Sequence, residues 1–257
     1  MPTPGPPRSG AQSVERALAV LRAFVEGGGA DLGVTQVAAA TGLTVSTTHR
    51  LVQALRHEGV LVQDPGSERY RLGPVLVVLG RLAERRLGLA GARPVLERLA
   101  EATGESVNLG VRSGAEVLVV LDVASSQPLR FDQAPGTRVP VHTSAMGKCL
   151  LAFTDDTAAE VAALPALTGA TDRTITDPTS LLADLQQVRD RGWALNDEER
   201  NPGVRAVGAP VLVAGRAAAA IAVQGPTVRL GDASLERVAT ALVAAAAEVA
   251  PLLATTG

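Results

Sequence analysis

Apolar side chains recur at helical spacing in three segments near the start of the chain. The first runs from Ser13 to the glycines at 27–29, the second covers Val34–Ala40, and the third begins after Leu43 and ends near Glu58. Each predicts an amphipathic helix, because apolar residues three and four positions apart share one helical face. Gly42 favours a tight turn between the second and third helices, since glycine accepts the positive φ that such a turn needs.

A hairpin is predicted directly after the third helix. Residues 60–63 and 70–72 have the composition of strands, and the turn-forming residues 64–68, Asp-Pro-Gly-Ser-Glu, join them. A short helix, a tight turn, a second helix and a hairpin in this order are typical of a winged helix-turn-helix. We therefore expect a winged helix-turn-helix domain over residues 13–73.

The rest of the pattern predicts a linker helix and an α+β domain. Residues 74–91 carry an apolar stripe whose partner is either a second copy of the helix or the neighbouring domain. Residues 92–257 form the second domain, with helices over 94–103, 178–192 and 235–253 and strands over 106–112, 116–124, 129–133, 207–213 and 217–223. The alanines at 218–222 leave room there for either a ligand or a close helix. Residues 1–12 contain four prolines and few apolar residues, so we expect a flexible tail.

The third helix has one polar face opposite its apolar face. At 100° per residue, the apolar face centres on Leu51 and Leu55, and the polar face carries small hydroxyl, basic and amide side chains. Such a face suits the major groove of DNA, where hydroxyls allow close approach and longer side chains reach bases or phosphates. The alternative is a polar face that meets only water. The candidate DNA contacts are Thr35, Ser46, Thr47, His49, Arg50, Gln53 and Arg69.

Composition limits the remaining possibilities. The chain has 257 residues with 24 basic and 26 acidic side chains, so any DNA-binding surface must be local. Its one cysteine, Cys149, has no partner for an internal disulfide, and no apolar run approaches the roughly 20 residues that span a bilayer. The start of the chain lacks a signal-peptide pattern, and we expect a cytoplasmic protein that makes no membrane contact.

The residues of common enzyme sites are present only in incomplete patterns. Ser144 and Lys148 are four positions apart, whereas the Ser-x-x-Lys nucleophile motif needs three. The phosphate-loop ending Gly-Lys at 147–148 lacks both the earlier glycine and the following Ser or Thr. The histidines and the cysteine fit no familiar metal spacing, and the acidic residues 197–199 are consecutive and cannot converge on one atom. We expect no catalytic site, no metal and no cofactor.

Three separated motifs give the chain a family resemblance. They are Ser46–Arg50 in the third helix, Val139–Ala152 with the sequence VPVHTSAMGKCLLA, and Asn196–Glu199 followed by Gly203 and Ala209–Val211. In this order they resemble the IclR family of bacterial transcriptional regulators from about Ser13 to Leu253. The resemblance implies a winged helix, a linker helix and an effector domain built on an antiparallel sheet like that of GAF or PAS sensors. It also implies homodimers or dimers of dimers on double-stranded palindromic operators, with repression favoured over activation.

The second motif contains a candidate effector site. Thr143 or Ser144 can cap a helix whose first amides, at Ala145, Met146 and Gly147, point outward. Free amides at the positive end of a helix dipole form a ready site for a carboxylate. The alternative is a capped helix with hydrated amides, and the resemblance favours a ligand.

The resemblance also supplies lining positions for this site. Members that bind small oxoacids place an acid, a thiol and two hydroxyls where this chain has Asn196, Ala206, Ala222 and Gln224, and apolar residues where it has Phe131 and Val139. The cavity is therefore expected to be wider and less polar, and to bind a larger organic or aromatic carboxylic acid. A metabolic enzyme or small-molecule binding protein with an accessory N-terminal domain is the alternative function.

Overall fold

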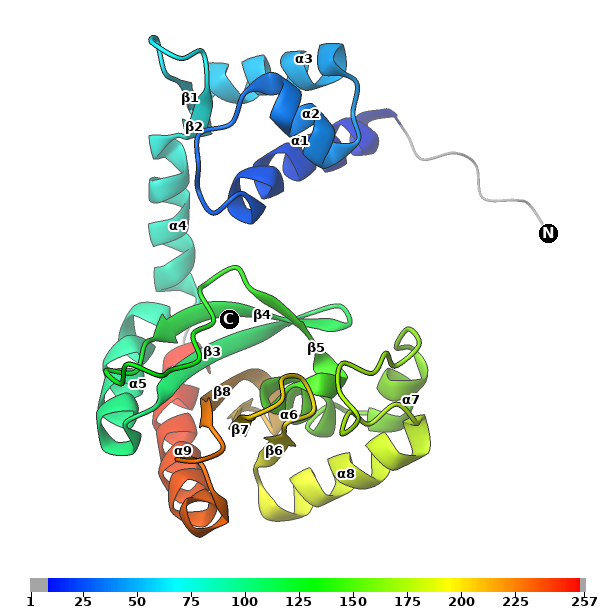
Figure 1. Cartoon of the computed structure of the whole chain (residues 1–257), viewed down its shortest axis with the longest axis vertical. Coiled ribbons are helices and arrows are strands. Elements are labelled where there is room, and N and C mark those ends of the chain that lie inside the picture. Colours follow the sequence, from blue (N-terminus) through cyan, green and yellow to red (C-terminus); the bar gives the residue numbers. More distant parts are fainter. Residues whose placement is uncertain (1–8, 255–257) are drawn as a thin grey trace, which may run out of the picture. The chain divides into compact units, whose positions relative to one another are not determined.

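The computed structural model describes residues 9–254, which divide into two compact units at Ala83 and Glu84 (Figure 1). The first unit contains α1 (Ser9–Glu26), α2 (Val34–Thr41), α3 (Val45–His57), β1 (Leu61–Gln63) and β2 (Tyr70–Leu72). The boundary between the units falls within α4 (Pro74–Arg86). The predicted order of helices and hairpin in the first unit is confirmed.

The core of the first unit comes from the apolar faces of its three helices and from the hairpin. The side chains of Val20, Phe24, Val37 and Val52 are fully buried and pack together. Tyr70 joins them from β2, and its backbone pairs with Leu32 as well as with β1. This packing fixes the hairpin against the helices and leaves the opposite face of α3 at the surface.

The first helix begins earlier than expected. Residues 9–12 were assigned to the flexible tail, but α1 starts at Ser9. Residues 9–12 contain no proline, so nothing in them prevents them from extending the helix. The rest of the predicted tail lies outside the described residues.

The predicted linker stretch 74–91 is not one helix, because it contains the whole of α4 and the start of α5 (Leu89–Thr103). Gly88 adopts a left-handed conformation (φ +67°) between the end of α4 at Arg86 and the start of α5. A Cβ at Gly88 would lie 2.3 Å from the carbonyl oxygen of Leu252, so the turn also needs glycine for space. The helix expected from Pro94 starts at Leu89 because Leu89 and Ala92 belong to its buried stripe.

The second unit is built on one antiparallel sheet in the order β5-β4-β3-β8-β7-β6. Its strands are β3 (Ser106–Ser113), β4 (Glu116–Val123), β5 (Arg138–Pro140), β6 (Ala194–Asp197), β7 (Val204–Val213) and β8 (Arg216–Pro226). One core joins the sheet to α5 and α9 (Asp232–Ala254). A second core joins it to η1 (Val141–Thr143), α6 (Ala145–Ala152), α7 (Thr157–Ala162) and α8 (Pro178–Arg191) (Figure 1).

Alternation along the central strands explains the alanines of β8. Ile221 and Val223 face the core under α5 and α9, whereas Ala220 and Ala222 face the core that contains α6. On β7, a Cβ at Gly208 would lie 2.7 Å from the backbone of Ala145. Small residues therefore let α6 approach the sheet closely, and Ala222 also borders a cavity described below.

The strand predicted over 129–133 is wrong. These residues form an irregular segment, and the strand that pairs with β4 is β5 instead. Side chains bond to two carbonyls of this segment, because Asn108 donates to the carbonyl of Gln133 and Arg229 to that of Leu129. These bonds tie the segment to β3 and to the residues after β8 without extended pairing.

Candidate functional sites

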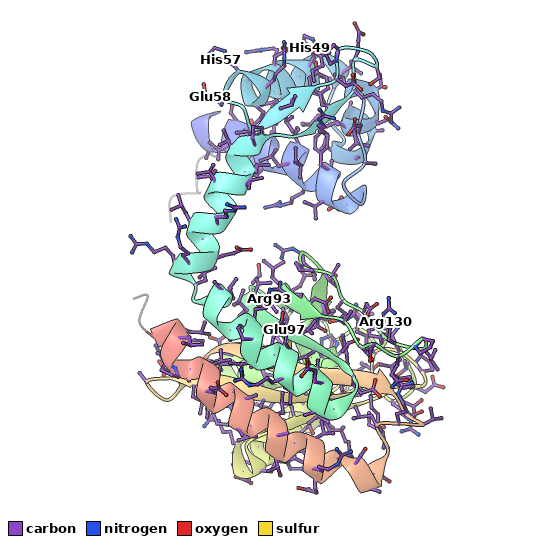
Figure 2. All side chains as sticks on the ribbon, turned by 90° about the vertical axis from the view of Figure 1, so that its left-hand side faces the viewer. His49, His57, Glu58, Arg93, Glu97 and Arg130 are labelled. Atoms are coloured by element: carbon purple, nitrogen blue, oxygen red, sulfur yellow. The ribbon has the colours of Figure 1, made fainter. Side chains whose placement is uncertain are left out.

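The exposed face of α3 carries most of the predicted DNA contacts. Thr44 caps the helix by accepting a hydrogen bond from the amide of Thr47 at 3.3 Å, and its own hydroxyl donates to the Thr47 hydroxyl. Ser46, His49 and Arg50 are exposed, and His49 lies at the surface of the unit in Figure 2. The first turns of α3 thus present hydroxyl, imidazole and guanidinium groups outward.

Gln53 differs from the other predicted contacts. Its Nε2 donates to the Tyr70 hydroxyl at 2.9 Å, and its Oε1 accepts from Arg56 at 3.1 Å. The Tyr70 ring is buried in the core, so this bond connects α3 to the hairpin. The Gln53 amide is therefore used in a bond within the first unit. The position of Gln53 on the polar face of α3 does not indicate this bond, because Tyr70 lies 17 residues further along the chain.

The hairpin and α2 share a second group of polar contacts. Arg69 is exposed, and it donates to the carbonyl of Asp31 and to Gln36 Oε1, both at 2.9 Å. Gln36 also caps the start of α2, next to the exposed Thr35. In the turn, the Gly66 amide donates to Asp64 and holds the pKa of that carboxyl below its ordinary value. The Arg69 guanidinium therefore lies beside the N-terminus of α2.

The predicted effector residues converge on one small cavity at the start of α6. Ser144 caps α6 by accepting a hydrogen bond from the Gly147 amide at 3.0 Å. The cavity wall includes eight of the predicted residues, namely Phe131, Ser144, Ala145, Met146, Asn196, Ala206, Ala222 and Gln224. These residues come from the irregular segment before β5, from α6 and from β6, β7 and β8.

Two predicted residues are not part of this wall. Val139 is fully buried in the core that contains α6. Gly147 packs against η1, where a Cβ would lie 2.1 Å from the carbonyl oxygen of Val141, and its amide is used by Ser144. Gly147 is therefore a packing residue, and its amide is not available to a ligand.

The cavity is smaller than expected. Its volume is about 20 Å³, which is room for about one water molecule. A wider, less polar space was expected because the family's polar lining residues are lost or altered in this chain, but α6 packs closely against the small residues of β7 and β8. Four further residues line the cavity that the sequence did not predict, Gln133, Arg200, Asn201 and Val204. No motif indicated them, because they lie in loops or at a strand end.

Most polar groups around the cavity are paired within the protein. Asn196 donates to the carbonyl of Thr143 at 2.7 Å and accepts from the Glu199 amide at 2.9 Å. Gln224 donates to Asn108. Two buried atoms of the wall have no hydrogen-bond partner, Oε1 of Gln133 and Nη1 of Arg200. Burial also lowers the pKa of Arg200 from its ordinary value.

A buried ion group lies on α6 one turn beyond the cavity. Lys148 is 1% exposed, and its Nζ donates to Glu199 Oε1 at 2.5 Å and to the carbonyl of Leu195 at 3.3 Å. The same nitrogen lies 2.9 Å from Asp184 Oδ2 on α8. Burial raises the pKa of Glu199 above its ordinary value, although Lys148 opposes this shift. Lys148 therefore connects α6 to α8 and to the loop after β6.

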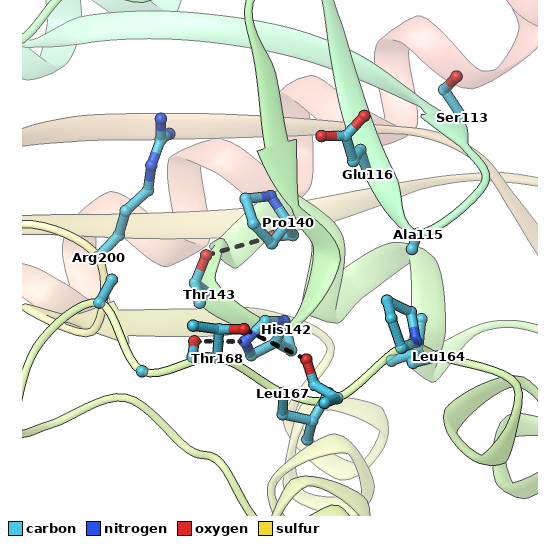
Figure 3. Close-up of a pocket in the computed structure, with 14 residues that line it drawn as sticks. Ser113, Ala115, Glu116, Pro140, His142, Thr143, Leu164, Leu167, Thr168 and Arg200 are labelled. Carbon is cyan, nitrogen blue, oxygen red and sulfur yellow. Dashed lines mark hydrogen bonds between the residues drawn. The ribbon is translucent and has the colours of Figure 1, made fainter.

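A larger outer cavity lies on the other side of η1. It has a volume of about 550 Å³ and is lined mainly by apolar residues of β5 and of the loop before α8 (Figure 3). His142 Nε2 donates to the carbonyl of Thr168 at 3.1 Å and holds this loop against η1. Arg200 lines both the outer and the small cavity.

The residues considered for catalysis have structural roles. Asp197 pairs with Arg205 and Arg173, whereas Glu199 points to Lys148, so the neighbouring carboxylates diverge. Within residues 9–254, no group of His, Cys, Asp and Glu side chains could hold a metal ion. Among the described helices, none has the length and apolar character needed to cross a membrane.

Cys149 is expected to be unreactive in the folded protein. Its side chain is fully buried, and burial raises the pKa of the thiol to about 12, so almost no thiolate forms near neutral pH. At pH 8, a thiol reagent such as DTNB should label the native chain only as fast as it unfolds, and should label the urea-unfolded chain at once. Rapid labelling of the native protein would contradict the buried position.

Comparisons with known proteins match both units. A family model described as the IclR helix-turn-helix domain matches residues 13–65, and one described as the bacterial transcriptional regulator IclR C-terminal domain matches residues 86–250. The chain is 39% identical over 243 residues to the HTH-type transcriptional regulator BhcR of Paracoccus denitrificans, covering 93% of this chain and 86% of the relative. It is 31% identical over 244 residues to the transcriptional repressor IclR of Escherichia coli, covering 93% of this chain and 88% of the relative. The crystal structure of a regulator from Alicyclobacillus acidocaldarius superposes with a TM-score of 0.84 at 28% identity, covering 96% of this chain and 99% of the other.

Proposed function

The chain belongs to the IclR family of bacterial transcriptional regulators, and we propose that it represses transcription by binding an operator through α3 until an organic acid binds the second unit. The family consists of DNA-binding regulators with an effector domain and not of enzymes, so the alternative of a metabolic enzyme is excluded. A regulator of this kind acts where the chromosome is, which for a bacterium is the cytoplasm.

The exposed face of α3 is the observation that carries the DNA-binding proposal. Ser46, Thr47, His49 and Arg50 enter the major groove, where the hydroxyls allow close approach and Arg50 reaches a base edge. Thr35 of α2 and Arg69 of the hairpin, which bonds to Gln36 at the start of α2, contact a phosphate beside the hairpin. Gln53 positions α3 through Tyr70.

The exposed apolar side chains of α4 support a homodimer. No residue of α4 is buried, and Val77, Val78 and Leu79 are each more than half exposed. An unpartnered apolar stripe of this kind is typical of an interaction surface. Two copies joined through α4, alone or as a dimer of dimers, place two α3 helices on a palindromic operator.

The cavity at the start of α6 is the proposed effector site. Its wall combines the amides of Ala145 and Met146 with the amides and the guanidinium of nearby side chains, an environment that favours a carboxylate. The effector is a small organic or aromatic carboxylic acid, and the cavity must open to admit it because its closed volume is that of one water. The acid acts only through its different affinity for the two arrangements of the regulator.

Fluorescence anisotropy on labelled DNA from the upstream region of the protein's own gene tests this proposal. The titration is run at fixed salt with a panel of organic acids, since affinity for DNA falls steeply with ionic strength. We expect tight, sequence-specific binding that one acid weakens. Binding strengthened by an acid would replace repression with activation or co-repression, and binding without sequence preference would contradict a DNA-binding role for α3.

A further inference from the structure

Two unpartnered polar atoms belong to residues of the same small cavity. Gln133 is 7% exposed, and its Oε1 is buried without a hydrogen-bond partner. Nη1 of Arg200 is likewise buried without a partner. Both side chains line the cavity at the start of α6. The Arg200 side chain is directed away from His142 and Thr168, as Figure 3 shows.

Such atoms are uncommon in a folded protein. A buried polar group without a partner destabilises the folded protein, and more so when it is charged. Other amides of the same wall avoid this cost, because Asn196 bonds to Thr143 and Gln224 bonds to Asn108. Gln133 and Arg200 therefore differ from the other polar residues of this wall, because each has a buried atom whose hydrogen-bonding capacity the described residues do not use.

The two atoms need different hydrogen-bond partners. A guanidinium nitrogen donates and carries positive charge, so its best partner is a carboxylate. An amide oxygen only accepts, so its partner must donate a hydrogen bond. A molecule that satisfies both has a carboxylate and a hydroxyl group.

We propose that Arg200 and Gln133 select a hydroxy acid as the effector, with its carboxylate on Arg200 and its hydroxyl donating to Gln133 Oε1. This inference rests on the proposed effector site and adds two specificity-determining residues to it. The carboxylate is thus held by a side chain as well as by the start of α6, and the hydroxyl distinguishes the effector from a simple acid.

Arg200 also lies where an acid could enter the small cavity from the outer one. The small cavity holds about 20 Å³ and the outer cavity about 550 Å³, and Arg200 lines both. Arg200 therefore borders both spaces, and a change in its side-chain conformation on acid binding would alter both. The apolar body of a larger acid then lies against Pro140, Leu164 and Leu167 of the outer cavity.

Matched pairs of acids test the selection. Binding to the full chain is measured by isothermal titration calorimetry with glycolate against acetate, and with 4-hydroxybenzoate against benzoate. In at least one pair, the hydroxy acid should bind about tenfold or more tighter, because the acid without the hydroxyl leaves Gln133 unpaired. Equal affinities within both pairs, or no binding by any of the four acids, would overturn the proposal.

Three variants assign the two roles. Gln133→Leu should weaken the hydroxy acid about tenfold and leave its partner acid unchanged. Arg200→Gln should weaken both acids of the pair, and Arg200→Lys should retain part of the affinity because it keeps the charge. Arg93→Gln is the matched control, since Arg93 lies on the exposed surface of α5 (Figure 2) and should have no effect. Wild-type acid affinity in folded Gln133→Leu and Arg200→Gln would mean that water alone pairs the two atoms.

The DNA-binding assay separates this inference from the proposed function. None of the variants touches α3, so each should bind DNA like the wild type when no acid is present. Selective acid binding without any effect on DNA would support the Gln133 and Arg200 roles and contradict regulation by the acid. An effect on DNA from acids that ignore both variants would support regulation and contradict these roles.

Discussion

Replacing Lys148 by methionine is expected to lower the free energy of unfolding of the second unit by about 3 to 5 kcal/mol. The lysine is 1% exposed and is the cation for both Glu199 and Asp184. Methionine preserves much of the length and apolar contact of the side chain, but it leaves two carboxylates without their charge partner. Urea unfolding followed by circular dichroism measures the loss.

Two controls connect this loss to charge rather than to packing. Adding Glu199→Gln to Lys148→Met removes one stranded charge and should restore part of the stability. Arg93→Gln removes a cation whose pair with Glu97 is 4.0 Å long and about half exposed, and should change stability by less than about 0.5 kcal/mol. A Lys148→Met chain as stable as the wild type would contradict the buried ion group.

The Lys148→Met deficit should also depend on pH. Burial raises the pKa of Glu199, and loss of Lys148 removes the main influence that lowers it. A carboxyl with a folded pKa above its unfolded value costs stability while it is ionised, and this cost disappears as the pH falls through the folded pKa. The loss of unfolding free energy in Lys148→Met should therefore become smaller as the pH is lowered from neutral. This change should begin at pH values above about 4.3, the ordinary pKa of glutamate.

Replacing Arg50 by alanine is expected to weaken specific operator binding by about 1 to 3 kcal/mol, which is about 5- to 150-fold. The guanidinium is exposed on α3 beside His49 and follows the capped first turn, so it is free to reach a base edge in the groove. Anisotropy with specific and scrambled duplexes at several salt concentrations measures the loss. Removal of a base contact should affect the specific duplex most.

The scrambled duplex supplies the control for Arg50. An equal loss on both duplexes, together with a smaller salt slope, would assign Arg50 to a phosphate. Arg93→Gln should bind both duplexes like the wild type, because it lies on α5 in the other unit. Unchanged operator affinity of the Arg50 variant would leave Arg50 as a solvated residue of α3.

Local patterns were enough to predict the first unit. The helices at α2 and α3 and the strands at β1 and β2 depend on residues near one another, such as Gly42 and the Asp64 turn. The strand predicted at 129–133 is absent although its composition is strand-like, since β4 pairs with β5 and residues 129–133 pair with no strand. Whether a segment forms a strand depends on a partner strand elsewhere in the chain, and the composition of the segment alone does not identify that partner.

The candidate cavity was likewise only partly predictable from the sequence. The resemblance brought together residues as distant as Phe131 and Gln224, which spacing alone does not connect. It could not indicate that Gln53 bonds to Tyr70, that Gly147 packs on η1, or that Arg200 lines the wall. These contacts depend on how far particular side chains reach after the backbone has folded.

The strand order also has a consequence for synthesis on the ribosome. β3 lies at the centre of the sheet and pairs with β8, which is the last strand to be made. The first unit is complete by Ala83, so it can fold before β8, the central partner of β3, has been synthesised. A nascent or truncated chain that ends before Arg216 is therefore expected to retain a folded winged helix but no folded second unit. The DNA binding of such a fragment is expected to show no response to an effector.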